Sequence, residues 1–269
     1  MGRAMELISG SNAVSTLAFQ QVANAAPNVT QIRNFASGRA FVTNAWLQSA
    51  AGGADVVLQV KSPQGHDNVT GLMMGTQDQV VKRLMPGYAE LEVFAQDNLD
   101  VSISDPGVGN VCVESLLVDY ENLPGGDARL ASWAEVSPRI KRLLGVRVNL
   151  TSGGTAGQYG GAVAINALDD QFKANQDYAI LGYSVDTAGA TIASIGIQSA
   201  DFANYRLGGP ASLDAIETRD LFVQMGEERG VGCIPLFNAA NKFNTIVDCL
   251  DVATATSFQV VFNLAWLTT

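Results

Sequence analysis

Hydrophobic and polar residues alternate along most of this chain, the pattern of β-strands with one buried face. The clearest case is SFQVVFNLAWL (257–267), in which Phe258, Val260, Phe262, Leu264 and Trp266 share one face. In DVVLQVK (55–61), Val56, Leu58 and Val60 oppose Val57, Gln59 and Lys61. Further strands are predicted at ELEVF (90–94), LDVSIS (99–104), VCVESLLVDY (111–120), CIPLF (233–237) and FNTIVDCL (243–250).

Two segments have a helical pattern instead. In TQDQVVKRLM (76–85), Thr76 is a candidate N-cap, Val80, Val81 and Leu84 form one face, and Pro86-Gly87 ends the segment. SLDAIETRDLF (212–222), with Ser212 as its candidate cap, lies at the corresponding place in the second half. One short helix is therefore predicted in each half of the chain.

The two halves resemble each other at an offset of 137 residues. WLQSAAGGADVVLQVKS (46–62) aligns without a gap with YSVDTAGATIASIGIQS (183–199). The match extends from residue 35 to residue 85, and the offset grows to about 144 by the last strand. The matched pairs are Phe35 with Phe172, Phe41 with Tyr178, Trp46 with Tyr183, Leu58 with Ile195, Val60 with Ile197, Gly71 with Gly208, and Leu84-Met85 with Leu221-Phe222.

Short alternating strands, frequent turns and an internal repeat predict an all-β fold of two tandem antiparallel β-sandwiches. Pro124-Gly125-Gly126 indicates a linker. We expect residues 1–128 to form an N-terminal arm and the first sandwich, and residues 129–269 to form the linker and the second. An N-terminal arm of this length frays unless something holds it, and Leu7, Val14, Leu17 and Val22 are the apolar side chains that could dock it.

Composition agrees with a large core, since 47% of the 269 residues are hydrophobic and 16% are charged. The net charge of −10 disfavours general nucleic-acid binding. One basic segment, SPRIKRLLGVR (137–147), carries Arg139, Lys141, Arg142 and Arg147. We interpret it as a solvated or interface-pairing segment, with lipid headgroups or nucleic acid as alternative contacts.

Targeting and redox signals are weak. The apolar run AVSTLAF contains Ser15 and Thr16 and follows Glu6, so we do not expect a signal peptide. No apolar run has the length of a membrane span. Cys112, Cys233 and Cys249 are odd in number and lack C-x-x-C spacing, so buried reduced thiols are expected.

Catalytic residue types are scarce. His66, the only histidine, lies in the loop SPQGHDN, where a solvated turn residue is the simpler interpretation. The glycine-rich segment 153–161 has no Lys-Ser/Thr after it, so it is not a phosphate loop. We therefore predict no catalytic and no cofactor-binding residues, and no enzyme.

Aspartates gather at Asp97, Asp100 and Asp105, and again at Asp169-Asp170 and Asp177. Loops rich in Asp on sandwiches can hold structural Ca²⁺. Turn formation explains these residues without a metal, because the EF-hand spacing is absent. No motif indicates a metal ligand.

The duplicated sandwich, with a helix at matching places and few catalytic residues, resembles the double jelly-roll major capsid proteins of tailless icosahedral viruses, especially bacteriophages with an internal membrane. The resemblance is architectural and transfers no functional residue. It implies a structural subunit that forms homotrimers with a near-hexagonal footprint. It also implies contacts with neighbouring trimers, with other capsid or vertex proteins and with an internal membrane, without specific nucleic-acid recognition. The place would be the virion, after synthesis in the host cytoplasm.

The main alternative is a tandem β-sandwich that binds carbohydrate or another ligand, as lectins and adhesins do, because a fold does not determine function. Such a protein would expose aromatic side chains in loops. Trp46 and Trp266 fall in predicted strands and Trp133 in the linker, which favours structural roles. A capsid fold with a long spine helix is a further alternative, but no long amphipathic helix is visible.

Overall fold

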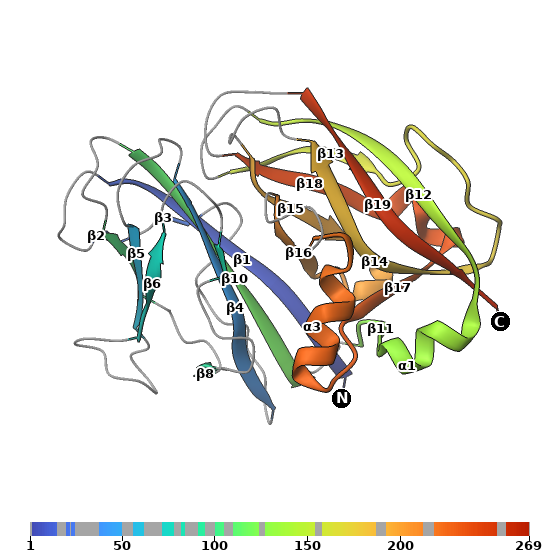
Figure 1. Cartoon of the computed structure of the whole chain (residues 1–269), viewed down its shortest axis with the longest axis horizontal. Helices are drawn as coiled ribbons and strands as arrows, with labels where there is room; N and C mark the ends of the chain where they lie inside the picture. The colour runs from blue at the N-terminus through green and yellow to red at the C-terminus, as the bar shows by residue number, and fades with distance from the viewer. Residues whose placement is uncertain are drawn as a thin grey trace.

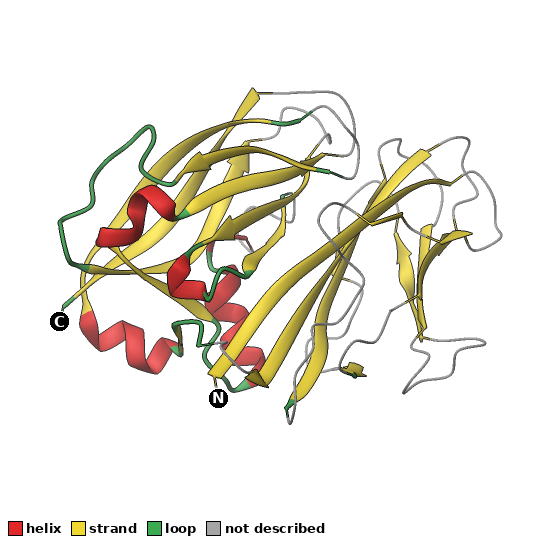
Figure 2. Ribbon diagram, turned by 180° about the vertical axis from the view of Figure 1, so that it is seen from behind, coloured by secondary structure: helices red, strands yellow, loops and turns green. Residues whose placement is uncertain are grey.

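The computed structural model describes residues 2–14, 20–21, 23–24, 38–49, 56–61, 72–77, 82–83, 91–94, 100–104, 110–123, 127–153, 158–186, 192–211, 218–251 and 257–268. Antiparallel strands dominate these residues, and helices are few and short (Figure 2). No described helix is long and apolar enough to cross a membrane.

The strands of the first half are β1 (Gly2–Val14), β2 (Gln20–Gln21), β3 (Ala23–Asn24), β4 (Arg39–Ser49), β5 (Val56–Lys61), β6 (Leu72–Gln77), β7 (Lys82–Arg83), β8 (Leu91–Val93), β9 (Asp100–Ser104) and β10 (Asn110–Leu123). Those of the second half are β11 (Leu130–Ala131), β12 (Ile140–Thr151), β13 (Tyr159–Ala164), β14 (Asp177–Asp186), β15 (Ile192–Gln198), β16 (Arg206–Pro210), β17 (Ile234–Asn238), β18 (Ile246–Asp251) and β19 (Ser257–Leu267). The helices are α1 (Trp133–Val136), α3 (Leu221–Arg229) and the 3-10 turns η1 (Ser137–Arg139), η2 (Ala200–Phe202) and η3 (Ala239–Asn244).

Alternation in β19 produces the core of the second half. Phe258, Val260, Phe262, Leu264 and Trp266 are all buried, as the sequence predicts. The Phe262 ring meets the Tyr183 ring edge-on, with the centroids 5.8 Å apart. Tyr183 donates a hydrogen bond to the carbonyl of Pro210 at 3.0 Å, which joins β14 to β16 across the core. Burial raises the pKa of Tyr183 well above its ordinary value, so this hydroxyl keeps its proton.

The two halves have the same strand order. In the first half β1, β10, β4 and β8 are neighbours in one sheet, and β2, β9, β5 and β6 form the other. In the second half the corresponding orders are β12-β19-β14-β17 and β13-β18-β15-β16. The chain is therefore an all-β protein made of two antiparallel β-sandwiches in tandem, which confirms the predicted fold class.

Register supports the same correspondence. Trp46 lies opposite Ser115, and Tyr183 lies opposite Phe262, so β4 and β14 match at an offset of 137. Ser115 and Phe262 are 147 residues apart, so the offset grows slightly beyond the expected 144. In four of the matched pairs both residues are buried: Phe41 and Tyr178, Trp46 and Tyr183, Leu58 and Ile195, Val60 and Ile197. Phe35, Gly71, Leu84 and Met85 lie outside the described residues.

The sheets are stacked as layers. The sheet of β1, β10 and β4 lies between the β2-β9-β5-β6 sheet and the second half (Figure 1). β1 lies beside β16, and β10 contacts β15 and β16. Because the β1-β10-β4 sheet is covered on both sides, consecutive residues such as Leu116, Leu117 and Val118 are all buried.

The N-terminal segment differs from the expectation of a docked arm. Residues 2–14 form β1, which pairs with β10 along nearly its whole length. Leu7 is buried in the chain's own core, Val14 is the last residue of β1, and Leu17 and Val22 lie outside the described residues. A strand buried on both faces shows no clean alternation, which is why the pattern did not reveal it.

The helix prediction holds in the second half as far as the structure describes it. Thr218 and Arg219 are helical, and α3 begins at Leu221 and continues to Arg229, beyond the predicted end, while Ser212 lies outside the described residues. In the first half, the prediction over 76–85 is wrong at its described ends. Thr76 and Gln77 pair with β5, and Lys82 and Arg83 pair with β4, so ladder pairing overrides helical propensity there.

Candidate functional site

The candidates singled out in the sequence do not converge on one place. His66, Asp97 and Asp105 lie outside the described residues. Asp100 begins β9, opposite Lys61. Cys233 and Cys249 are buried free thiols, as expected, and Cys112 lies in β10. Among the described residues, no group of three or more metal-ligating side chains is assembled.

The three aspartates of the second group separate into three different ion pairs. Asp169 binds Arg147 at 2.9 Å, Asp170 binds Lys242 at 2.5 Å, and Asp177 binds Arg129 at 2.6 Å. Each carboxylate is thus turned toward its own cation. This arrangement fixes loops and strand ends, and it does not form an oxygen cage for a divalent ion.

These ion pairs predict acid sensitivity. Hydrogen bonds from Arg147 and Lys242 lower the pKa of Asp169 and Asp170, respectively. For Asp177, burial alone would raise the pKa, but hydrogen bonds from Arg129 and Asn238 outweigh it, so the pKa is lowered. A carboxylate with a lowered folded-state pKa stabilises the fold above its unfolded-state pKa of 3.8. That contribution is lost as the pH falls through the folded-state pKa.

We therefore expect urea unfolding to require less denaturant at about pH 3 than at about pH 6. Asp177→Asn removes one half-buried carboxylate of the set and should reduce this difference. An unfolding midpoint that stays constant from about pH 6 to about pH 3 would contradict the expectation.

The glycine-rich segment has a packing role at its described end. A Cβ atom at Gly160 would lie 2.7 Å from the backbone nitrogen of Gly153. Gly161 has a φ of +71°, a backbone conformation that favours glycine. These two glycines let β13 start directly beside the end of β12. Residues 154–157 lie outside the described residues.

The basic segment forms the exposed edge of the second sandwich. Lys141, Arg142 and Arg147 are exposed on β12, and Arg139 lies in the turn before it. The Lys141 ammonium lies 4.5 Å from the centre of the Trp266 ring. The exposed strand edge agrees with the interpretation of a solvated or interface-pairing segment.

A buried charge cluster joins the two halves, and the sequence analysis did not find it. Asp119 of β10 is fully buried and binds Arg3 of β1 at 2.8 Å and Arg229 of α3 at 2.6 Å. Arg3 also donates to the carbonyl of Gly232. Burial alone would lower the pKa of Arg3, but the attraction of Asp119 outweighs it and the pKa is raised.

Local structure explains how Arg229 reaches this cluster. α3 ends at Arg229, and Gly230 follows with a φ of +67°, the left-handed conformation that closes a helix C-terminus. A Cβ atom at Gly232 would lie 2.6 Å from the carbonyl carbon of Ala131, so only glycine fits there. The sequence RGVG thus brings the Arg229 guanidinium and the Gly232 carbonyl to the same place.

A hydrogen-bonded row of hydroxyl groups continues the contact between the halves. Ser115 lies 2.9 Å from Ser9 and 3.0 Å from Ser194, measured between side-chain oxygens. The Ser9 hydroxyl also lies 2.9 Å from that of Tyr159. Ser9, Ser115 and Ser194 are buried, so these hydrogen bonds satisfy polar groups that have left water.

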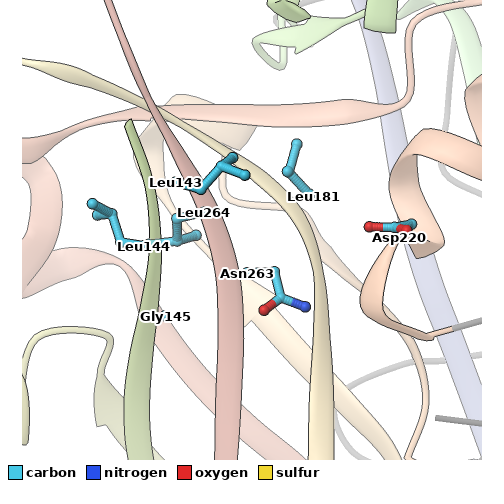
Figure 3. A pocket seen from close by; sticks show the side chains of 7 residues that line it. All are labelled: Leu143, Leu144, Gly145, Leu181, Asp220, Asn263 and Leu264. Carbon is cyan, nitrogen blue, oxygen red and sulfur yellow. The ribbon is translucent and has the colours of Figure 1, made fainter. Parts of the chain in front are cut away.

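The outer face of the second sandwich carries a shallow hollow of about 340 Å³. Its walls are Leu143, Leu144, Gly145, Leu181, Asp220, Asn263 and Leu264 (Figure 3). Asp220 is the only titratable residue among them, so the hollow lacks the paired acid and base of general catalysis. Its leucines are better suited to contact another apolar surface.

Comparison with known proteins gives only distant similarities. No protein-family model and no curated protein sequence matches this chain. Among solved structures, the major capsid protein P2 of bacteriophage PM2 is similar at 7% identity, over 99% of this chain and 98% of that chain, with a TM-score of 0.23. STIV MCP is similar at 9% identity over 98% and 97% of the two chains, with a TM-score of 0.20.

A third similar chain comes from the atomic structure of Sulfolobus turreted icosahedral virus, at 9% identity over 98% of this chain and 91% of that chain, with a TM-score of 0.23. TM-scores in this range do not establish a common fold.

Proposed function

We propose that this chain is a structural subunit of a viral capsid that assembles with further copies of itself. The observation that carries the proposal is the duplicated β-sandwich, in which both halves have the same strand order and pack directly on each other. The buried cluster of Asp119, Arg3 and Arg229 supports a block whose halves do not move independently. A shell subunit needs such a fixed block.

The proposed assembly unit is a homotrimer. Three chains with two sandwiches each place six similar sandwiches around an axis, and cyclic symmetry is the usual route for identical chains. Further proposed contacts are neighbouring trimers, other capsid or vertex proteins and an internal membrane. The proposed location is the virion, with synthesis in the host cytoplasm. We place the boundary between the halves near residue 128, and we propose no catalytic or cofactor-binding residues.

Light scattering and electron microscopy of the purified protein test this function. We expect three times the chain mass of 28.3 kDa, about 85 kDa, or larger assemblies built from it. Micrographs are expected to show shells or hexagonal arrays. A monomer at micromolar concentration without arrays, together with saturable binding on a glycan array, would replace this proposal with the carbohydrate-binding alternative.

A further inference from the structure

Two edge strands at opposite ends of the molecule expose apolar side chains. On β12, Leu143 is 62% exposed, and on β6, Leu72 and Met73 are 38% and 51% exposed. Each strand is the last of its sheet, and its outer edge has no strand partner within the part of the chain that the structure describes. Edges of this kind readily pair with another chain unless something covers them.

The internal repeat relates these edges to a contact that already exists within the chain. By strand order, β12 corresponds to β1 and β6 corresponds to β16. β1 of the first half lies beside β16 of the second half. If the two halves exchange roles, β12 takes the place of β1 and β6 takes the place of β16. The repeat therefore predicts one further, reciprocal contact of the same kind, between β12 and β6.

A single chain cannot form that reciprocal contact, because β6 and β12 lie at opposite ends of the molecule (Figure 1). We infer that β12 of one copy packs beside β6 of a second copy, as β1 packs beside β16 within the chain. This inference rests on the proposed function and names the surfaces through which copies would meet. It places Leu143 of one copy against Leu72 and Met73 of the next.

The net charges of the two halves also favour a second copy of this chain as the partner. Residues 1–128 contain 13 acidic and six basic side chains, a net charge of −7, whereas residues 129–269 contain 13 and 10, a net charge of −3. The basic residues Lys141 and Arg142 are exposed on β12. An acidic first half of one copy thus meets the basic strand of another.

The contact is heterologous, because two different surfaces meet. Contacts of this type form closed rings when the rotation between copies closes, and open filaments when it does not. A ring would repeat the relation between the two halves around one axis, which agrees with the proposed trimer. A twofold dimer would instead bring β12 against β12.

Cysteine cross-linking tests the contact. Met73→Cys and Leu143→Cys are made in a chain with Cys112→Ser, since Cys233 and Cys249 are buried. Both substituted side chains are exposed, so the variants should fold. A short bismaleimide is expected to link chains only when the two variants are co-expressed. Phe243→Cys, at a 65% exposed position outside both strands, is the control and should give no link with Met73→Cys.

The outcomes separate the contact from the function. Linked chains in the co-expressed sample alone support the contact. Links in Leu143→Cys alone would indicate a twofold contact and overturn the inference. Trimers or shells in light scattering without any Met73–Leu143 link would overturn the inference and leave the capsid function standing. Monomers alone would overturn both.

Discussion

Replacing Asp119 by Ala is expected to lower the free energy of unfolding by about 3–5 kcal/mol, the cost of leaving buried charges without their partner. Asp119 is fully buried, and it forms ion pairs with two guanidinium groups, those of Arg3 at 2.8 Å and Arg229 at 2.6 Å. Arg229 itself is only 6% exposed, so water cannot replace the lost carboxylate. Urea unfolding followed by circular dichroism measures the change.

An exposed ion pair supplies the matched control. Arg39 and Glu92 lie 3.1 Å apart with side chains 60% and 43% exposed, so Glu92→Gln should cost no more than about 1 kcal/mol. Asp119→Asn keeps the shape and one hydrogen-bond acceptor and serves as a milder variant if Asp119→Ala does not fold. Equal unfolding midpoints for the parent and both Asp119 variants would show that the cluster does not stabilise the interface between the halves.

Strands with one buried face could be predicted from the sequence because alternation directly reports burial. β19 runs over Ser257–Leu267, the full length of the predicted strand, and β5 begins one residue inside its prediction. Alternation gave less information where a sheet is covered on both sides. β1 was therefore interpreted as an arm. In β5, which belongs to the outer sheet, the expectation that Gln59 faces outward is wrong, because its side chain is only 4% exposed.

Sites built from distant residues could not be predicted in the same way. Arg3, Asp119 and Arg229 are separated by more than 100 residues from one another, and none belongs to a motif. The one available signal was Asp119, an acidic residue that directly follows the apolar run LLV in the predicted strand VCVESLLVDY. The sequence did single out the aspartates, as residues that could hold Ca²⁺. In the structure Asp169, Asp170 and Asp177 form separate ion pairs instead.

Truncating Phe262 to Ala is expected to destabilise the second sandwich by about 3–5 kcal/mol, since a buried aromatic is replaced by a cavity. Phe262 is fully buried in β19 and meets the Tyr183 ring, which itself joins β14 to β16 through the Pro210 carbonyl. Val261→Ala is the matched control, because Val261 is the preceding residue of the same strand and is only half-buried. The Val261→Ala substitution should lower the free energy of unfolding by only about 1 kcal/mol, close to the value for one buried methylene. Equal shifts of the urea midpoint for the two variants would mean that β19 does not present Phe262 to the core, and the alternation that predicts the fold would lose its clearest support.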